Sequence, residues 1–400
     1  MKAYTGLTVF TNDPRYPLIE DAYILVDDGQ IIEVEKKEGI VFPEDVAIED
    51  LDGCVAFPLL SNSYIDLSVP LKVWLSESFR GDAILENYKS AVLNGREYWL
   101  NEIERLNEVI ENTIERLLSL GMGNATFALP FTIDDPSEVL SRFESYPIKV
   151  IAGPVITTEE VEEDILKSFS ENDCPLFIVL DETFYEKHRL LSHYEATGTF
   201  YYIIPDFSRL EEVFIKTEGR RVIEIFRESN IFTGNSVIVH GWGLTDIELD
   251  VLAVRNVLVI KTPRFELLVH GGTLSLSEYI GRGMNVHLGT GPFSPNIFKE
   301  IESTLLFYRH TLRSTAPLKI LQELIIKLVF SEGLVPKKET NISKRLMKGF
   351  EASFAVATPA KKIKNLEELV LFLMEDFREE TLRLTINEGE EIWKNPFGHS

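Results

Sequence analysis

The chain has 400 residues and a formal net charge of −24 at pH 7, and 44% of its residues are hydrophobic. Such a charge repels nucleic acid and anionic membranes, so we expect neither as a partner. No apolar run is long enough to cross a bilayer, no leader pattern opens the chain, and two cysteines do not suggest a disulfide framework. We therefore expect a cytoplasmic protein with a large domain and a smaller one attached.

Hairpins are predicted near both ends of the chain. The first turns at Asp28-Gly29 between two apolar runs, and the second turns at Gly389 between similar runs. Glycine allows the positive φ that tight hairpin turns require. Two such hairpins at opposite ends of a chain can pair into one small sheet domain. We predict a composite β-sandwich built from residues 1–56 and 337–400.

Residues 57–336 show short apolar strands that alternate with helical stretches, the pattern of an α/β protein with a parallel sheet. The predicted strands after the first are 125–129, 148–152, 176–180, 237–240, 257–261 and 286–290. The run 201–205 is either a further short strand or an inserted element. The number of units favours a closed (β/α)8 TIM barrel over an open sheet.

The stretch 55–67 contains the first predicted barrel strand. Side chains alternate along a strand, so Tyr64 and Asp66 share one face. The stretch resembles the first barrel strand of the amidohydrolase superfamily, which usually reads Pro-Gly-Leu-x-(Asp/Asn)-x-His-x-His. Pro58 and Asn62 fit this pattern. Tyr64 and Asp66 stand where the family has its two metal-binding histidines.

Three further motifs resemble the deaminase and chlorohydrolase branch of that superfamily. Residues 237–246 are similar to its His-x-x-x-Leu-Thr, residues 262–268 to its Cys-Pro-Arg-Ser-Asn-x-x-Leu, and residues 283–291 to its Gly-x-x-Val-x-Leu-Gly-Thr-Asp. The order and spacing of the three motifs are together fairly specific. The likeness covers nearly the whole chain and implies a TIM barrel flanked by a small β-sandwich.

The resemblance also implies a metal, usually zinc, nickel or iron, held by four positions of the family. In this chain those positions are occupied by Tyr64, Asp66, Val179 and Gly291, with Val179 taken as the strand-five position. Zinc and similar ions require three or four nitrogen, oxygen or sulfur donors at short distance. Only Asp66 is a good donor of this kind. We therefore predict no metal ligands and no cofactor.

Two functional groups of the family that do not bind metal are kept. Residues 179–183 resemble the motif His-x-x-Glu-Thr, so Glu182 stands at the proton-shuttle position. His240 stands at the strand-six position, which in the family faces the substrate. Without a metal, no bound water has its pKa lowered toward neutrality, and Glu182 alone is a poor activator of water.

The predicted site lies at the carboxyl ends of the barrel strands. Its catalytic candidates are Asp66, Glu182 and His240, and its substrate-binding candidates are Tyr64, Lys261 and Arg264. Each has a structural alternative. A buried carboxylate can accept hydrogen bonds from neighbouring backbone, and a buried tyrosine usually packs with a satisfied hydroxyl. For Lys261 and Arg264, the alternative is an ion pair with Glu266 or Asp66.

Two functions compete on this evidence. The first is a superfamily protein that has lost its metal site and serves a structural, regulatory or ligand-binding role, with a small-molecule pocket at the barrel mouth. The second is a hydrolase or deaminase of small cyclic substrates whose site is rebuilt from Asp66, Glu182 and His240. A shifted alignment is a third explanation, but no His-x-His occurs anywhere in the chain. The sequence leaves open whether the chain is an enzyme and whether it forms a homo-oligomer.

Overall fold

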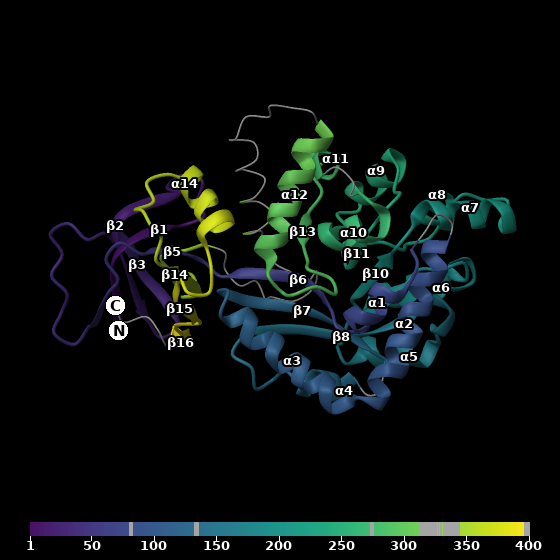
Figure 1. Ribbon diagram of the computed structural model, residues 1–400, viewed down its shortest axis with the longest axis horizontal. Coiled ribbons are helices and arrows are strands. Elements are labelled where there is room, and N and C mark those ends of the chain that lie inside the picture. The colour runs from purple at the N-terminus through teal and green to yellow at the C-terminus, as the bar shows by residue number, and fades with distance from the viewer. Residues whose placement is uncertain are drawn as a thin grey trace.

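The structure is a computed structural model that describes residues 1–79, 83–131, 136–272, 276–312, 326, 328, 330 and 345–395. Within these residues the strands form two eight-stranded sheets, one all-parallel and one mixed. Figure 1 shows the mixed sheet beside the parallel sheet, which the helices surround. The predicted (β/α)8 barrel with a small β domain from both chain ends is confirmed. The proposed domain boundary at residues 336 and 337 lies outside the described residues.

The parallel sheet is the barrel. Its strands, in sequence and in spatial order, are β6 (Leu60–Asp66), β7 (Met122–Pro130), β8 (Lys149–Thr157), β9 (Leu176–Val179), β10 (Phe200–Ile204), β11 (Ser236–His240), β12 (Leu258–Lys261) and β13 (Val286–Leu288). The ring closes where Ile65 of β6 bridges Gly291 just after β13. Gly289 permits this approach, because a Cβ there would lie 2.6 Å from the Cβ of Tyr64.

The barrel strands are apolar because both of their faces are covered, as is usual in parallel sheets. All five residues of β10 are buried, as are all residues of β9, β11, β12 and β13. One face packs under the surrounding helices. The other face lines the barrel interior, where Val179, Ile203 and Val239 belong to one buried cluster with Tyr64 and Phe177.

Helices follow most barrel strands and cover the outside of the sheet. The described helices are α1 (Leu71–Ser76), α2 (Ile84–Asn101), α3 (Ile103–Leu118), α4 (Pro136–Ser141), α5 (Glu163–Glu171), α6 (Phe184–Glu195), α7 (Phe207–Glu218), α8 (Val222–Glu228), α9 (Asp246–Val254), α10 (Pro263–His270), α11 (Leu276–Gly281), α12 (Ile297–Leu312) and α14 (Leu366–Leu371). Short 3₁₀ and π segments span Thr158–Glu160 and Phe372–Asp376. On α3, Leu106, Ile110 and Ile114 repeat at helical spacing and are buried.

The mixed sheet joins the two ends of the chain. Its strands are β1 (Lys2–Phe10), β2 (Leu18–Asp27), β3 (Gln30–Lys36), β4 (Ala47–Asp50), β5 (Val55–Pro58), β14 (Phe354–Ala357), β15 (Leu382–Asn387) and β16 (Glu390–Lys394). Both predicted hairpins are present, as β2–β3 and β15–β16. Their turns meet: a Cβ on Gly389 would lie 2.8 Å from the Cα of Gly29. β5 pairs with both β1 and β14, and a single residue, Leu59, connects it to β6.

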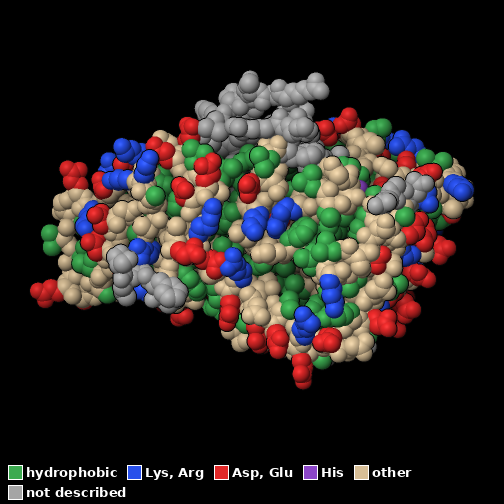
Figure 2. Space-filling view, viewed as in Figure 1, with side chains coloured by type: hydrophobic (Ala, Val, Ile, Leu, Met, Phe, Trp, Pro, Cys, Tyr) green, Lys and Arg blue, Asp and Glu red, His purple; other side chains and the backbone are tan. Residues whose placement is uncertain are grey.

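Figure 2 shows acidic side chains spread over the visible face, with basic side chains between them rather than in one separate patch. No helix among the described residues has the length and hydropathy needed to cross a membrane.

Candidate functional site

Asp66 and Tyr64 lie together at the carboxyl end of β6, as the strand periodicity predicted. Both oxygens of the Asp66 carboxylate are occupied: one accepts from the backbone nitrogen and hydroxyl of Ser68 at 3.0 and 2.6 Å, and the other from the Tyr64 hydroxyl at 3.3 Å. Burial raises the pKa of Asp66 to about 6, against the opposing effect of the Ser68 hydrogen bonds. Asp66 therefore accepts hydrogen bonds from neighbouring groups, as the structural alternative predicted. Its burial also makes the ionised form of the carboxylate costly.

His240 ends β11 and also faces the barrel mouth. Its Nδ1 lies 2.7 Å from the hydroxyl of Thr262, and its Nε2 lies 3.3 Å from the hydroxyl of Tyr88. Burial and the nearby positive charge of Lys261 lower the pKa of His240 well below its ordinary value, so the ring is neutral. The residue also has φ of +67°, a conformation that costs a non-glycine residue about 1–3 kcal/mol and is often found at functional sites.

Three aromatic side chains cover this end of the barrel, and the sequence analysis did not single them out. Trp74 of α1, Tyr88 of α2 and Phe265 of α10 pack on one another, with ring centroids 4.7 Å apart for Trp74 and Tyr88 and 5.0 Å for Trp74 and Phe265. The ring of Phe265 lies 5.2 Å from that of His240. Under this cover, Asp66 is 3% exposed and His240 is 2% exposed. In the described conformation, solvent scarcely reaches either group.

Lys261 adopts the structural alternative. Its ammonium is fully buried and lies 2.9 Å from the carboxylate of Glu266, which is also buried. The same ammonium donates a hydrogen bond to the backbone carbonyl of His240. The other oxygen of Glu266 accepts from the backbone nitrogen of Thr262 at 3.1 Å. This ion pair therefore ties the ends of β11 and β12 to α10, and a substrate-binding role for Lys261 stays a prediction.

Arg264 also forms an ion pair, but its partner is neither of the two acids suggested from the sequence. Its guanidinium and its backbone nitrogen both contact the carboxylate of Glu300 on α12, which is buried. Burial raises the pKa of Glu300 to about 7, although the charge of Arg264 acts in the opposite direction. The pair fixes α10 against α12. A substrate-binding role for Arg264 stays a prediction.

Glu182 lies apart from the other catalytic candidates. Its side chain is 48% exposed and lies 3.2 Å from the ammonium of Lys89 on α2, which also contacts the buried carboxylate of Asp181 at 3.2 Å. Among the described residues, no hydrogen bond or ion pair connects Glu182 with Asp66 or His240. The predicted cluster of three catalytic groups is therefore not assembled in this conformation, and the role of Glu182 stays untested.

The assignment of Val179 to the fifth barrel strand was wrong. The structure places Val179 at the end of β9, the fourth strand, and makes β10 the fifth. The two strands pair in register, with Ile203 beside Val179, and both side chains belong to the cluster inside the barrel. Both runs are short and apolar, so hydrophobicity alone does not distinguish them. When the spacing His-x-x-Glu is placed on β10, Ile203 takes the ligand position, and Asp206 takes the carboxylate position and caps α7 through Arg209.

The donors at the barrel mouth do not suit a catalytic divalent cation. Such a site needs three or four protein donors and an open coordination position. Here the acceptors of Asp66 and both ring nitrogens of His240 have partners within the chain, and the fifth strand offers Ile203. Across the described residues, no group of three or more His, Cys, Asp or Glu side chains is placed to hold a metal ion.

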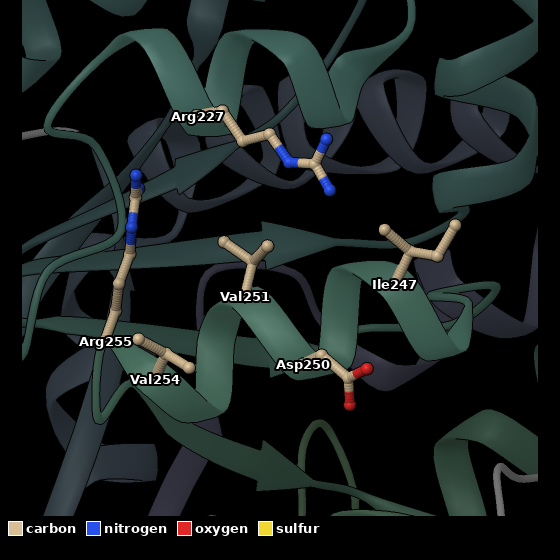
Figure 3. A pocket seen from close by; sticks show the side chains of 6 residues that line it. All are labelled: Arg227, Ile247, Asp250, Val251, Val254 and Arg255. Atoms are coloured by element: carbon tan, nitrogen blue, oxygen red, sulfur yellow. The ribbon is translucent and has the colours of Figure 1, made fainter.

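Two cavities lie away from this site. The first, of about 440 Å³, lies between α8 and α9 and is shown in Figure 3, where Arg227 extends from α8 above the side chains of α9. The second, of about 630 Å³, lies on the mixed sheet between β2, β3 and residues 346–348. None of the predicted site residues lines either cavity. The predicted small-molecule pocket at the barrel mouth stays a prediction.

A closed parallel barrel, an accessory sheet from both chain ends and polar groups at the strand ends define an α/β-barrel protein. In comparisons with known proteins, no family model matches the chain. A 5-methylthioadenosine/S-adenosylhomocysteine deaminase of Bacillus cytotoxicus is 22% identical over 93% of this chain and 89% of its own length. That of Thermococcus sibiricus is 33% identical over 24% of each chain.

Solved structures show the same fold. Atrazine chlorohydrolase TrzN of Arthrobacter aurescens, in complex with zinc, superposes with a TM-score of 0.75 at 14% identity, covering 100% of this chain and 97% of that one. Guanine deaminase of E. coli superposes with a TM-score of 0.70 at 16% identity, covering 98% and 100%. The chain is thus similar in sequence to 5-methylthioadenosine/S-adenosylhomocysteine deaminases, and it shares its fold with a chlorohydrolase and a guanine deaminase.

Proposed function

We propose that this chain is an amidohydrolase-fold protein that has lost the family's metal site and binds a small molecule at the barrel mouth in a regulatory or structural role. One observation carries the proposal. Among the described residues, the barrel mouth offers only Asp66 and His240 as good donors, and both are hydrogen-bonded within the chain, whereas a catalytic metal needs three or four protein donors. A ligand-binding role needs no activated water, so the apolar Val179 and Ile203 beneath the mouth are compatible with it.

The first prediction concerns bound metal. We expect the protein, expressed with zinc, nickel or iron supplied, to contain clearly substoichiometric metal by elemental analysis, because the donor set is incomplete. We also expect no turnover of amidines, aminopurines or triazines. The deaminase of Bacillus cytotoxicus, prepared in parallel, serves as the control. One equivalent of metal together with turnover of any of these compounds would contradict the proposal.

A second candidate function rests on the proximity of Asp66 and His240. Tyr64 contacts both, with its hydroxyl 3.3 Å from the carboxylate and its ring centroid 5.9 Å from that of the imidazole. A carboxylate whose pKa is about 6 and a neutral imidazole are suited to acid–base chemistry without a metal. This arrangement would support a hydrolase or deaminase with a rebuilt site, provided that Glu182 joins it.

The second prediction separates the two functions. We expect Glu182→Gln and His240→Ala to leave any hydrolytic activity of the preparation unchanged, because we assign no catalysis to these groups. Glu159→Gln is the matched control, since Glu159 is another exposed acid that contacts Lys89, at 3.7 Å. A rebuilt acid–base site would instead lose about 10²–10⁴-fold in kcat/KM in both variants but not in the control. That outcome would establish the second function.

A further inference from the structure

Helix α1 is attached to the barrel mouth by few apolar side chains. The helix spans six residues, of which Trp74 is buried and Val73 is partly buried against the same cluster. Leu71 and Leu75, one on each side of them, are 37% and 60% exposed. Pro70 precedes the helix without a side-chain cap, and no acidic side chain lies in the first turn. A segment with so few buried contacts belongs to the least stable parts of a fold and opens locally at small cost.

Trp74 covers two aromatic side chains that contact His240. Its ring packs against Tyr88 and Phe265, and each of these contacts His240, Tyr88 through its hydroxyl and Phe265 through its ring. The indole is 1% exposed. If α1 moved outward with Trp74, a space the size of one indole would open between Tyr88 and Phe265, above His240.

Among the described residues, packing alone holds the indole there. Its Nε1–H is buried and has no hydrogen-bond partner among them. A buried donor without a partner destabilises the conformation that buries it, because the same group would bond to water when exposed. The closed arrangement therefore carries a cost that is relieved when Trp74 leaves the mouth.

We propose that Trp74 is a built-in occupant of the barrel mouth, and that α1 moves outward to let a flat ring of about the size of indole take its place between Tyr88 and Phe265. The chain thus regulates its own site by self-occlusion. This inference rests on the proposed function only in placing the ligand at the barrel mouth. It assigns to α1 the step that controls access.

The third prediction compares two tryptophans in the unmodified full chain. Trp74 and Trp99 are 1% and 4% exposed, and the Nε1–H of each lacks a partner within the described part of the chain, so static burial predicts equal exchange with solvent. We expect the indole proton of Trp74 to exchange at least fivefold faster, measured by NMR on protein labelled with ¹⁵N-tryptophan. Trp74→Phe and Trp99→Phe assign the two signals. A ratio below five overturns the proposal.

A cavity variant tests the occupant directly. Trp74→Gly should bind added indole, seen as a saturable rise in Tm, whereas Leu75→Gly, an exposed neighbour on the same helix, should show no rise. If Trp74→Gly folds but shows no rise in Tm with indole, the proposal is overturned. If this variant does not fold, the ratio of the two indole exchange rates decides. Stoichiometric zinc with turnover would refute the proposed function without changing either result, so the two failures are distinguishable.

Discussion

Replacing Lys261 by methionine is expected to lower the free energy of unfolding by about 3–5 kcal/mol, the typical cost of removing one partner of a buried ion pair. The change leaves the carboxylate of Glu266 buried without its cation and removes the donor to the carbonyl of His240. Urea unfolding measures the effect. A lysine kept to bind an anionic ligand would be dispensable for stability, so the size of this loss also distinguishes the two interpretations of Lys261.

Two controls sharpen the result. Lys261→Met combined with Glu266→Gln removes both charges and keeps an oxygen for the backbone nitrogen of Thr262, so it should recover at least half of the loss. Glu212→Gln breaks an exposed pair with Arg209 and should cost no more than about 1 kcal/mol. Equal losses in the single and double Lys261 variants would mean that packing, rather than the uncompensated charge, sets the cost.

Raising the pH from 5 to 8.5 is expected to destabilise the chain through Glu195. This residue ends α6, is fully buried, and accepts hydrogen bonds from the backbone nitrogen of Phe232 and the hydroxyl of Ser236. Burial raises its pKa from 4.5 to about 8. The folded chain therefore favours the protonated acid, and the stability this provides is complete below about pH 4.5 and is lost as the pH rises through 8.

The loss from this one group is on the order of 4 kcal/mol. The side chain at position 195 cannot ionise in Glu195→Gln, so the free energy of unfolding of this variant should vary less with pH. Between pH 5 and 8.5, the difference in free energy of unfolding between variant and wild type should change in favour of the variant by about 4 kcal/mol. Glu186→Gln, an exposed acid on the same helix, should keep the wild-type profile. Parallel profiles for Glu195→Gln and wild type would show that Glu195 is already ionised at pH 5 in the folded chain.

The sequence predicted those parts of the fold where local pattern and structure agree. The hairpins at Asp28-Gly29 and Gly389 follow from turn chemistry, and Tyr64 and Asp66 share a strand face because the side-chain period of a strand is two. The run 201–205 was left open as a strand or an inserted element, and Val179 was assigned to the fifth strand, because the short apolar runs of β9 and β10 are equivalent in pattern and differ only in their spatial order. Counting strands between Asp66 and His240 is the signal that would have found the fifth strand.

Long-range contacts account for what the sequence missed at the site. Arg264 pairs with Glu300, 36 positions away, and no local pattern connects the two. Tyr88 reaches His240 from α2, and Trp74 of α1 packs on Tyr88, whereas periodicity marks both segments only as helices. Tertiary packing decides which apolar side chains leave the core and cover a strand end. The available hint in the sequence was Trp74, an aromatic residue that follows shortly after the first barrel strand.

The position of β5 has a consequence for synthesis of the protein. This strand lies between β1, made at the start of the chain, and β14, whose pairing of Phe354 with Pro58 joins residues far apart in the sequence. A nascent chain on the ribosome therefore carries β5 with one edge unpaired while the entire barrel is translated. Such an edge invites pairing with other chains. The connectivity of the fold therefore leaves this edge open to such pairing until β14 has been synthesised.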